Sequence, residues 1–363
     1  MARRGGKGGR LVLVINPGST STRLALFRDL VCADETTLEH SARELGRFTS
    51  AARQEQWRAG LVAGYLVEHG VEARELAAAV GRGGLLAPLA GGTYLVGAKM
   101  KRELRSAKHG SHASNLGALL ADRVARQAGC PAFVVDPVVV DELSPEARLS
   151  GVPELPRRSV FHALSQKAAA RLACSELGIG YRRAKLVVAH LGGGISVAAH
   201  RGGRVVEVNN ALDGEGPFSA ERAGTLPAGD LVRLALSRKY GRAELLELLK
   251  GRGGLVAHLG TNSLMEVERR VKRGEQKARL VFGALGYGIA RSITGCYAAL
   301  GGTPHAVVLS GGMSCSRKLV AGIRRRLGKA TRVLVYPRNL EMAALAEGAL
   351  RVLSGREPAL RYR

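Results

Sequence analysis

Two short apolar segments joined by a turn of glycine and hydroxyl residues form a pattern that occurs twice in this sequence. The first copy spans residues 11–27 around Asn16-Pro17-Gly18-Ser19-Thr20-Ser21, and the second spans residues 186–199 around Gly192-Gly193-Gly194. Such a pattern is typical of a β-hairpin. Because glycine has no Cβ, the turn can bring backbone N–H groups and hydroxyls close to an anion. The duplication predicts two similar domains that close on a nucleotide and transfer a phosphoryl group.

Strand and helix patterns alternate along the rest of the chain, which predicts an α/β fold. A third apolar segment, residues 306–310, ends in another glycine turn at Gly311-Gly312. Ser111 has the chemistry of an N-cap for a helix that runs to about Gln127. The other expected helices cover residues 51–70, 73–80, 162–177, 230–250, 264–300 and 341–353, and further strands cover residues 133–136 and 333–336.

Composition restricts the partners of the chain. With 363 residues there is room for two domains, each with a core. The formal net charge is +25, but the arginines are spread thinly and aromatic residues make up only 4%, which argues against a nucleic-acid partner. The five cysteines form no C-x-x-C pair, which argues against a disulfide framework or a zinc site. No uninterrupted apolar run is long enough to span a membrane, so we expect a cytoplasmic protein.

Several side chains are candidates for phosphate chemistry, although neither a P-loop nor a dinucleotide-binding glycine motif is present. The turn at 16–21 offers an amide and hydroxyls to phosphate, or is an ordinary strand connection. Arg82 lies in a run of glycines and could clamp a carboxylate or phosphate; the alternative is a surface arginine. Asp136 ends a strand and could orient a metal or its waters, or could cap a turn. His162, expected at a hinge, could donate to phosphoryl oxygens, or could be an ordinary surface histidine.

Eight segments in order carry a resemblance to a known family. The chain resembles the butyrate kinases, in the acetate-kinase branch of the actin, heat-shock chaperone and sugar-kinase superfamily. The resemblance runs from Leu11 to about Leu353. It rests on Asn16–Ser21, Gly91–Tyr94, His112–Gly117, Val135–Glu142, Phe161–Leu164, His190–Val197, Asn209–Phe218 and Leu345–Arg351.

The resemblance implies a fold of two similar ribonuclease-H-like lobes, as in actin-like ATPases, with a nucleotide cleft between them. The N-terminal lobe would span 11–144, completed by a C-terminal helix at about 343–363, and the nucleotide-binding lobe would span 145–342. It also implies reversible, Mg²⁺-dependent phosphorylation of a short-chain fatty acid by ATP, giving butanoyl phosphate and ADP from butanoate. Self-association into a homo-oligomer is expected from the same likeness.

Site residues are likewise implied by the resemblance. Arg82 would bind the acid's carboxylate, supported by His112, and His162 would bind the transferred group. Asp136 and Glu341 would organise the metal, through water for Glu341. The phosphate and ATP contacts would come from Asn16, Ser19, Ser21, His190, Gly192, Gly193, Gly194, Gly311 and Gly312. The acid's pocket would include Leu85, Leu86, Phe161 and Ala220, and the small Ala220 favours acids longer than acetate.

A fatty acid's carboxylate is ionised at pH 7, so it needs no general base before it attacks phosphorus. The enzyme must instead align the reactants and neutralise charge on the phosphoryl oxygens. Where acetate kinases carry an arginine after Gly-Thr, this chain has Leu226-Pro227, and we expect Arg222 or Arg158 to supply that cation. The alternatives are a branched-chain or propionate kinase and, more remotely, a catalytically silent nucleotide-binding regulator.

Overall fold

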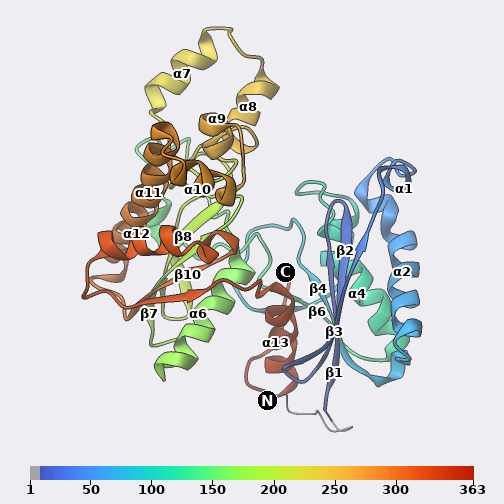
Figure 1. The fold of residues 1–363 in the computed structure, drawn as a ribbon. Coiled ribbons are helices and arrows are strands. Elements are labelled where there is room, and N and C mark those ends of the chain that lie inside the picture. Colours follow the sequence, from blue (N-terminus) through green and yellow to red (C-terminus); the bar gives the residue numbers. More distant parts are fainter. Residues whose placement is uncertain (1–8) are drawn as a thin grey trace. The chain divides into compact units, whose positions relative to one another are not determined.

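The computed structural model describes residues 9–363 of the protein, which form two compact units (Figure 1). Unit 1 contains the described residues up to Val140 together with Leu340–Arg363, and unit 2 contains Asp141–Asn339. The predicted boundaries after residues 144 and 342 differ from these by a few residues. Within residues 9–363, no helix is both long and apolar enough to cross a membrane.

Unit 1 is built on a seven-stranded sheet with the order β12-β5-β6-β4-β1-β2-β3. The neighbours β1, β4 and β6 are parallel, whereas β1, β2 and β3 form an antiparallel meander. Residues 11–15 of β1 are buried because the central strand is covered on both faces. The strands are β1 (Leu11–Pro17), β2 (Ser21–Arg28), β3 (Val31–Glu39), β4 (Leu76–Arg82), β5 (Thr93–Leu95), β6 (Ala132–Val135) and β12 (Leu360–Arg361).

Helices cover both faces of this sheet. In Figure 1, where the sheet is seen nearly edge on, α2 and α4 lie on one side of it and α13 on the other. A close contact fixes α13, since a Cβ on Gly348 would lie 2.5 Å from a methyl group of Val135 in β6. The helices are α1 (Ala42–Leu45), α2 (Glu55–Glu68), α3 (Ala98–Arg105), α4 (Asn115–Ala128) and α13 (Glu341–Leu353), with 3₁₀ turns at Ala51–Gln54 and Ala73–Glu75.

Two sequence predictions in unit 1 are wrong. The helix expected over residues 73–80 is a short 3₁₀ turn followed by β4, because these small apolar residues are buried in a central strand and tertiary burial outweighs alanine's helix propensity. Ser111 does not cap α4, which begins at Asn115 after Ser114. The expected hairpin, the strand ending before Asp136 and the helix over 341–353 are confirmed.

Unit 2 contains a five-stranded sheet with the order β11-β10-β7-β8-β9. Strands β7, β10 and β11 are parallel, and β7, β8 and β9 form an antiparallel meander. The predicted second hairpin is therefore confirmed. The strands are β7 (Lys185–Leu191), β8 (Ile195–Arg201), β9 (Arg204–Val208), β10 (Ala306–Ser310) and β11 (Val333–Tyr336).

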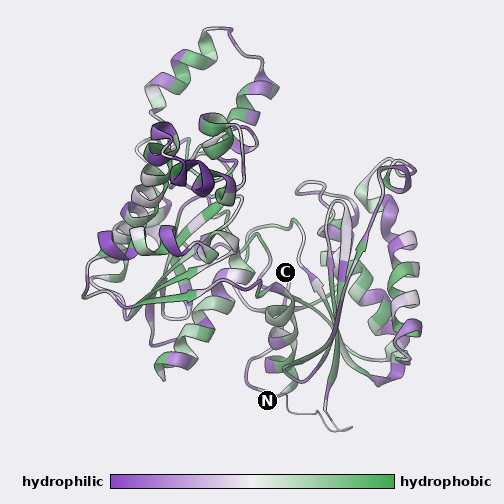
Figure 2. Ribbon diagram, viewed as in Figure 1, coloured by the Kyte–Doolittle hydropathy of each residue, from purple (hydrophilic) through white to green (hydrophobic). Residues whose placement is uncertain are grey.

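Helices α6 and α11 pack on this sheet, and alternating side chains of β8 show that they cover opposite faces. Ile195, Val197 and Ala199 join the apolar core beneath α11, whereas Ser196 and His200 bond to Gln166 of α6. Figure 2 shows hydrophobic residues along the strands and mainly hydrophilic residues on α10. The helices are α5 (Pro145–Arg148), α6 (Ala163–Leu177), α7 (Ala228–Leu236), α8 (Arg242–Lys250), α9 (Gly254–Leu259), α10 (Leu264–Lys272), α11 (Gln276–Leu300) and α12 (Arg317–Leu327), with a 3₁₀ turn at Gly312–Cys315.

Candidate active site

Three predicted site residues of unit 1 lie at the carboxyl ends of adjacent parallel strands. Asn16 is near the end of β1, Arg82 ends β4, and Asp136 directly follows β6. The strand register pairs Ile15 with Gly81 and Arg82 with Val135, so the three residues lie along one edge of the sheet. Ligands of open α/β sheets bind at this edge, beyond the ends of the strands.

The glycines around Arg82 serve close packing and do not form a flexible loop. A Cβ on Gly81 would lie 2.0 Å from the Gly117 carbonyl oxygen of α4, and one on Gly84 would lie 2.4 Å from Oδ1 of Asn115. No larger residue fits where β4 and its following turn meet the start of α4. Arg82 is therefore held between backbone segments that are in contact.

Arg82 pairs with the other predicted ligand at this edge, Glu341. Its Nη1 lies 2.8 Å from Oε2 of Glu341, and Nδ2 of Asn16 donates to the same oxygen at 3.4 Å. Glu341 is the first residue of α13, where the helix dipole favours a carboxylate. Arginine has five N–H donors, and its bond to Glu341 uses Nη1. A carboxylate substrate can therefore be bound by other N–H groups of the same guanidinium.

His112 is a neutral hydrogen-bond donor beside Arg82. Its Nδ1 accepts the backbone N–H of Ser114 at 3.1 Å, so the ring proton is on Nε2. Burial lowers the pKa of His112, and the positive charge of Arg82 lowers it further. At neutral pH the Nε2–H group can donate to an anion that Arg82 binds.

Asp136 has a strained backbone, which is common at functional sites. Its φ is 38°, in the left-handed region that few residues other than glycine adopt. Two hydrogen bonds with Gly92 hold it there: the Gly92 N–H donates to Oδ1 at 2.8 Å, and the Asp136 N–H donates to the Gly92 carbonyl at 3.0 Å. The side chain is buried, with 4% of the residue exposed. The hydrogen bond from Gly92 thus orients the Asp136 carboxylate.

The first hairpin turn lies above a buried cation that the sequence analysis did not identify. Arg58 of α2 is fully buried and donates from Nη1 to the Ser21 carbonyl at 2.9 Å and to the Thr22 hydroxyl at 2.8 Å. Burial lowers the pKa of its guanidinium to about 10. Ser19 itself is exposed and Ser21 is half-buried. One sequence signal could have identified Arg58: it lies four residues before Val62, on the side of α2 that carries the buried apolar residues.

In unit 2, two glycine turns follow the ends of adjacent parallel strands. Gly192–Gly194 joins β7 to β8, and Gly311-Gly312 follows β10. A Cβ on Gly311 would lie 2.5 Å from the Leu191 carbonyl oxygen, and its φ is 84°. Only glycine fits at position 311. The turn at Gly311-Gly312 therefore packs against Leu191, directly before the turn at Gly192–Gly194. The structure therefore brings the predicted phosphate-binding glycines of unit 2 together.

His162 and His190 are stacked beside these turns. Their ring centroids lie 4.2 Å apart, and His162 occupies the N-cap position of α6 without a capping bond from its side chain. Nδ1 of His162 lies 2.9 Å from the Ser196 hydroxyl, which also accepts a bond from Gln166. Sequence reasoning did not identify Gln166, because a glutamine one helical turn after a histidine has no distinctive signal. Ser196, which is itself bonded to Gln166, thus holds the ring of His162, the histidine predicted to bind the phosphoryl group.

Of the two arginines proposed for the missing cation, the structure places Arg222 at the glycine turn. A Cβ on Gly194 would lie 2.0 Å from Nη1 of Arg222, and this guanidinium also donates to the Ala211 carbonyl. Burial lowers the pKa of Arg222, partly offset by the nearby Glu221 and Asp213 carboxylates. Arg158, in contrast, is exposed. The position of Arg222 favours it as the cation of unit 2.

The run from Asn209 to Phe218, one of the eight segments that carry the resemblance, is tied to β8 by Asn209. Asn209 accepts the Val197 N–H at 2.7 Å and donates to the Ile195 and Glu215 carbonyls. This amide fixes the start of β8 directly after the glycine turn. The run from Asn209 to Phe218 therefore supports the turn through Asn209.

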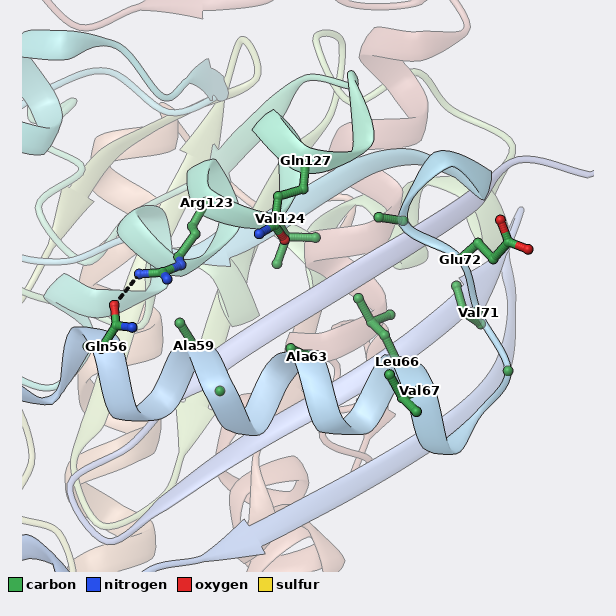
Figure 3. A pocket seen from close by; sticks show the side chains of 13 residues that line it. Gln56, Ala59, Ala63, Leu66, Val67, Val71, Glu72, Arg123, Val124 and Gln127 are labelled. Carbon is green, nitrogen blue, oxygen red and sulfur yellow. Dashed lines mark hydrogen bonds between the residues drawn. The ribbon is translucent and has the colours of Figure 1, made fainter.

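The proposed pocket residues differ in exposure. Phe161, Ala220 and Leu86 are buried, with 2%, 5% and 3% of each residue exposed, and Leu85 is half-buried. None of them lines the cavity of about 620 Å³ between α2 and α4. That cavity, whose lining residues are shown in Figure 3, is mostly apolar, and Arg123 and Gln56 among them are joined by a hydrogen bond of 2.5 Å. It contains no predicted site residue, so the four pocket assignments stay predictions.

Comparison with known proteins identifies the family. The Acetokinase family model matches residues 150–331. The chain is 44% identical to butyrate kinase 2 of Clostridium acetobutylicum and 49% identical to a probable butyrate kinase of Coprothermobacter proteolyticus, and in each case the match covers 97% of this chain and 99% of that protein. The crystal structure of Porphyromonas gingivalis acetate kinase matches with a TM-score of 0.72 at 18% identity, covering 95% of this chain and 100% of that one. The expected fold of two α/β lobes is confirmed, and the chain belongs to the acetokinase family.

Proposed function

We propose that this protein is a butyrate kinase, which reversibly converts butanoate and ATP into butanoyl phosphate and ADP. The observation that carries the proposal is the identity of 44% and 49% to proteins named as butyrate kinases over 97% of the chain. The polar groups at the strand ends of both units support it, because phosphoryl transfer is catalysed chiefly by positioning and charge neutralisation.

In this proposal, unit 1 binds the acid. Arg82 holds the butanoate carboxylate with guanidinium N–H groups other than the one bonded to Glu341, and the Nε2–H of His112 donates to the same carboxylate. A carboxylate oxygen attacks the γ-phosphorus of ATP, and the bond from phosphorus to the β,γ-bridging oxygen breaks. The electron pair of that bond leaves with ADP, so no proton has to be removed from the nucleophile.

Unit 2 binds the nucleotide's phosphates. The turns at Gly192–Gly194 and Gly311-Gly312 present backbone to phosphate oxygens, and Arg222 adds a positive charge beside the first turn. His162 donates to the oxygens of the transferred phosphoryl group, while Asn16, Ser19 and Ser21 of unit 1 also contact it. In this proposal, residues of both units take part in the transfer.

The carboxylates of unit 1 fit the donor chemistry of Mg²⁺. Mg²⁺ is usually held by one or two carboxylates together with waters and substrate phosphates, and Asp136 and Glu341 supply two. Among residues 9–363 there is no cluster of three or more acidic, histidine or cysteine ligands, which is consistent with a metal that arrives with its nucleotide. When bound, Mg²⁺ would neutralise charge on the β- and γ-phosphates. Asp136, held by Gly92, would orient its water ligands.

The experiment is acyl-phosphate formation from ATP and Mg²⁺, trapped as the hydroxamate, with acids from acetate to valerate and with isobutyrate and isovalerate. We expect the highest kcat/KM with butanoate and a graded decline on either side, because one methylene changes binding by about 1–3 kcal/mol. If kcat/KM were highest with a branched acid or with propionate, that acid would be the preferred substrate, and the proposed reaction type would still hold. ATP binding without turnover on any acid would contradict the proposal and favour a regulator.

We also propose that the protein acts in the cytoplasm, where ATP is available.

We further propose that the protein associates with a second copy of this chain through α7 and α8. Neither helix has a buried residue, and Val232 and Leu236 of α7 are 57% and 77% exposed. Contiguous exposed apolar side chains are typical of interaction sites. Light scattering should give a mass above 38.3 kDa, and Leu236→Glu should lower it towards that of the monomer.

A further inference from the structure

A chain of four hydrogen bonds runs behind His162 through the layer between α6 and β8 of unit 2. The Tyr181 hydroxyl lies 2.9 Å from Nδ1 of His200, and Nε2 of His200 lies 3.1 Å from Oε1 of Gln166. Nε2 of Gln166 donates to the Ser196 hydroxyl at 2.8 Å, and that hydroxyl lies 2.9 Å from Nδ1 of His162. We call these five residues the His162 relay. His200, Gln166 and Ser196 are each fully buried.

The orientation of the Gln166 amide fixes the direction of this relay. Its Nε2 also donates to the Ser196 backbone carbonyl at 2.9 Å, and a flipped amide would place two oxygens against each other there. Oε1 of Gln166 must therefore face His200, where it can only accept. His200 consequently carries its proton on Nε2. Burial, with the charge of Lys167, lowers the pKa of His200 to about 3, so the ring is neutral and Nδ1 accepts from Tyr181.

The same reasoning assigns the proton at the other end of the relay. In the part of the chain that the structure describes, the Ser196 hydroxyl has two partners, Gln166 and His162. It accepts from Gln166, so its own proton is available for Nδ1 of His162. If His162 instead donated from Nδ1, the buried Ser196 proton would have no acceptor, which costs free energy. The relay therefore favours neutral His162 with its proton on Nε2.

We propose that Ser196 and Gln166 are positioning residues that keep His162 neutral with its proton on Nε2, so that it approaches the phosphoryl group as a hydrogen-bond donor. This inference rests on the proposed function for the role of His162, but the tautomer itself can be measured without any substrate. The stacked His190 ring disfavours a state in which both imidazoles are charged, because two positive rings with centroids 4.2 Å apart would repel each other.

The test combines nuclear magnetic resonance with kinetics on the full-length enzyme. In ¹⁵N-histidine-labelled protein, two-bond ¹H–¹⁵N correlations distinguish the two neutral tautomers and the cation, and His162→Gln identifies the His162 signals. We expect the Nε2–H tautomer in the wild type. In Ser196→Ala we expect a mixture with the Nδ1–H form or the cation. We also expect kcat to fall about tenfold, with KM for ATP and butanoate changed by less than about twofold, since the substrates still bind.

Two further serine variants separate the relay from packing. Ser196→Thr keeps the hydroxyl and should restore the Nε2–H tautomer and most of kcat. Ser165→Ala removes a buried hydroxyl from α6 outside the relay and measures the general cost of such a change. If Ser196→Ala does not fold, Ser196→Cys keeps the volume with only a weak donor and should show the same tautomer change in part.

An unchanged His162 tautomer in Ser196→Ala, or in Ser196→Cys if that variant has to be used, would overturn the inference. So would a kcat loss no larger than that of Ser165→Ala. Failure of the proposed function would look different, because all variants would lack activity while the tautomer of His162 still responded to Ser196.

Discussion

The two units share one strand order but differ in the chemistry of their strand ends. From the meander edge inward, unit 1 has β3-β2-β1-β4-β6, and unit 2 has β9-β8-β7-β10-β11, with antiparallel and parallel pairs at matching places. Unit 1 has Asn16, Arg82 and Asp136 at or next to the ends of its strands, whereas unit 2 has glycine turns after two of its strands. The same scaffold thus presents charged side chains in one unit and mainly backbone in the other.

The hairpin turns show this difference most clearly. In the first, the Gly18 N–H donates to the Ser21 carbonyl at 2.8 Å, and in the second the Gly192 N–H donates to the Gly194 carbonyl at 3.2 Å. The first turn carries hydroxyls and lies over buried Arg58, whereas the second has no side chain and adjoins Arg222. We infer that the first turn suits a small group that is transferred, and the second a phosphate chain that must approach the backbone closely.

Substitution of Arg82 should have the largest effect. Arg82→Ala removes the proposed carboxylate clamp and leaves Glu341 without its 2.8 Å partner. We expect kcat/KM for butanoate to fall about 1,000-fold, or about 4 kcal/mol, which is typical when a buried or half-buried charge pair at a binding site is broken. Arg82→Lys is the matched control. It should recover part of the loss, because it keeps the charge without the planar fork. If Arg82→Ala left the kinetics unchanged, the proposal that unit 1 binds the acid through Arg82 would be wrong.

His162→Ala should have the next largest effect, and on a different parameter. Loss of one donor to a developing charge usually costs about 100-fold in kcat. We expect KM for both substrates to change by less than about threefold, since this bond strengthens mainly in the transition state. Steady-state kinetics with each substrate varied in turn measures both parameters. A rise in KM at constant kcat would assign His162 to ground-state binding.

Arg222 and Arg158 make a matched pair that tests the cation of unit 2. Arg222→Ala should lower kcat/KM by more than about tenfold, that is, by more than about 1.4 kcal/mol. Arg158 is exposed, so Arg158→Ala should change kcat/KM by less than about twofold. Equal losses in the two variants, measured with ATP as the varied substrate, would refute the assignment of Arg222.

Acid should destabilise unit 2 through His200. The pKa of His200 is about 3 in the folded protein against an ordinary value of 6.5, because the ring is fully buried. The unfolded chain therefore binds a proton that the folded chain does not, and the free energy of unfolding decreases as pH falls from 6.5 towards 3. The expected contribution is about 1.4 kcal/mol per pH unit at most. His200→Gln has no such titration, so urea unfolding of the two proteins at several pH values should converge at low pH. Parallel pH dependences would contradict this account.

Much of the fold followed from local sequence patterns, and much of the site did not. The helix at 341–353 matches the prediction because its apolar residues recur at helical spacing, and the strand at 333–336 matches because it is a short run of β-branched and aromatic residues. The stretch 73–80 was assigned wrongly since burial on both faces of a central strand leaves no alternation to read. The glycines around Arg82 resemble a loop in the sequence, and only the contact with α4 shows that they are packed. Gln166 and Arg58 act through bonds to residues distant in sequence, which no spacing reveals.

The most direct test of the division between the units is a crossed measurement of KM. Arg82→Lys alters unit 1, and Gly194→Ala alters unit 2, where the added Cβ would lie 2.0 Å from Nη1 of Arg222. We predict that Arg82→Lys raises KM for butanoate about tenfold with KM for ATP nearly unchanged, and that Gly194→Ala does the reverse. Gly193→Ala, whose Cβ would lie 3.9 Å from its nearest neighbour, is the control for Gly194→Ala and should have a smaller effect. If both Arg82→Lys and Gly194→Ala raised KM for the same substrate, the assignment of acid to unit 1 and nucleotide to unit 2 would be contradicted.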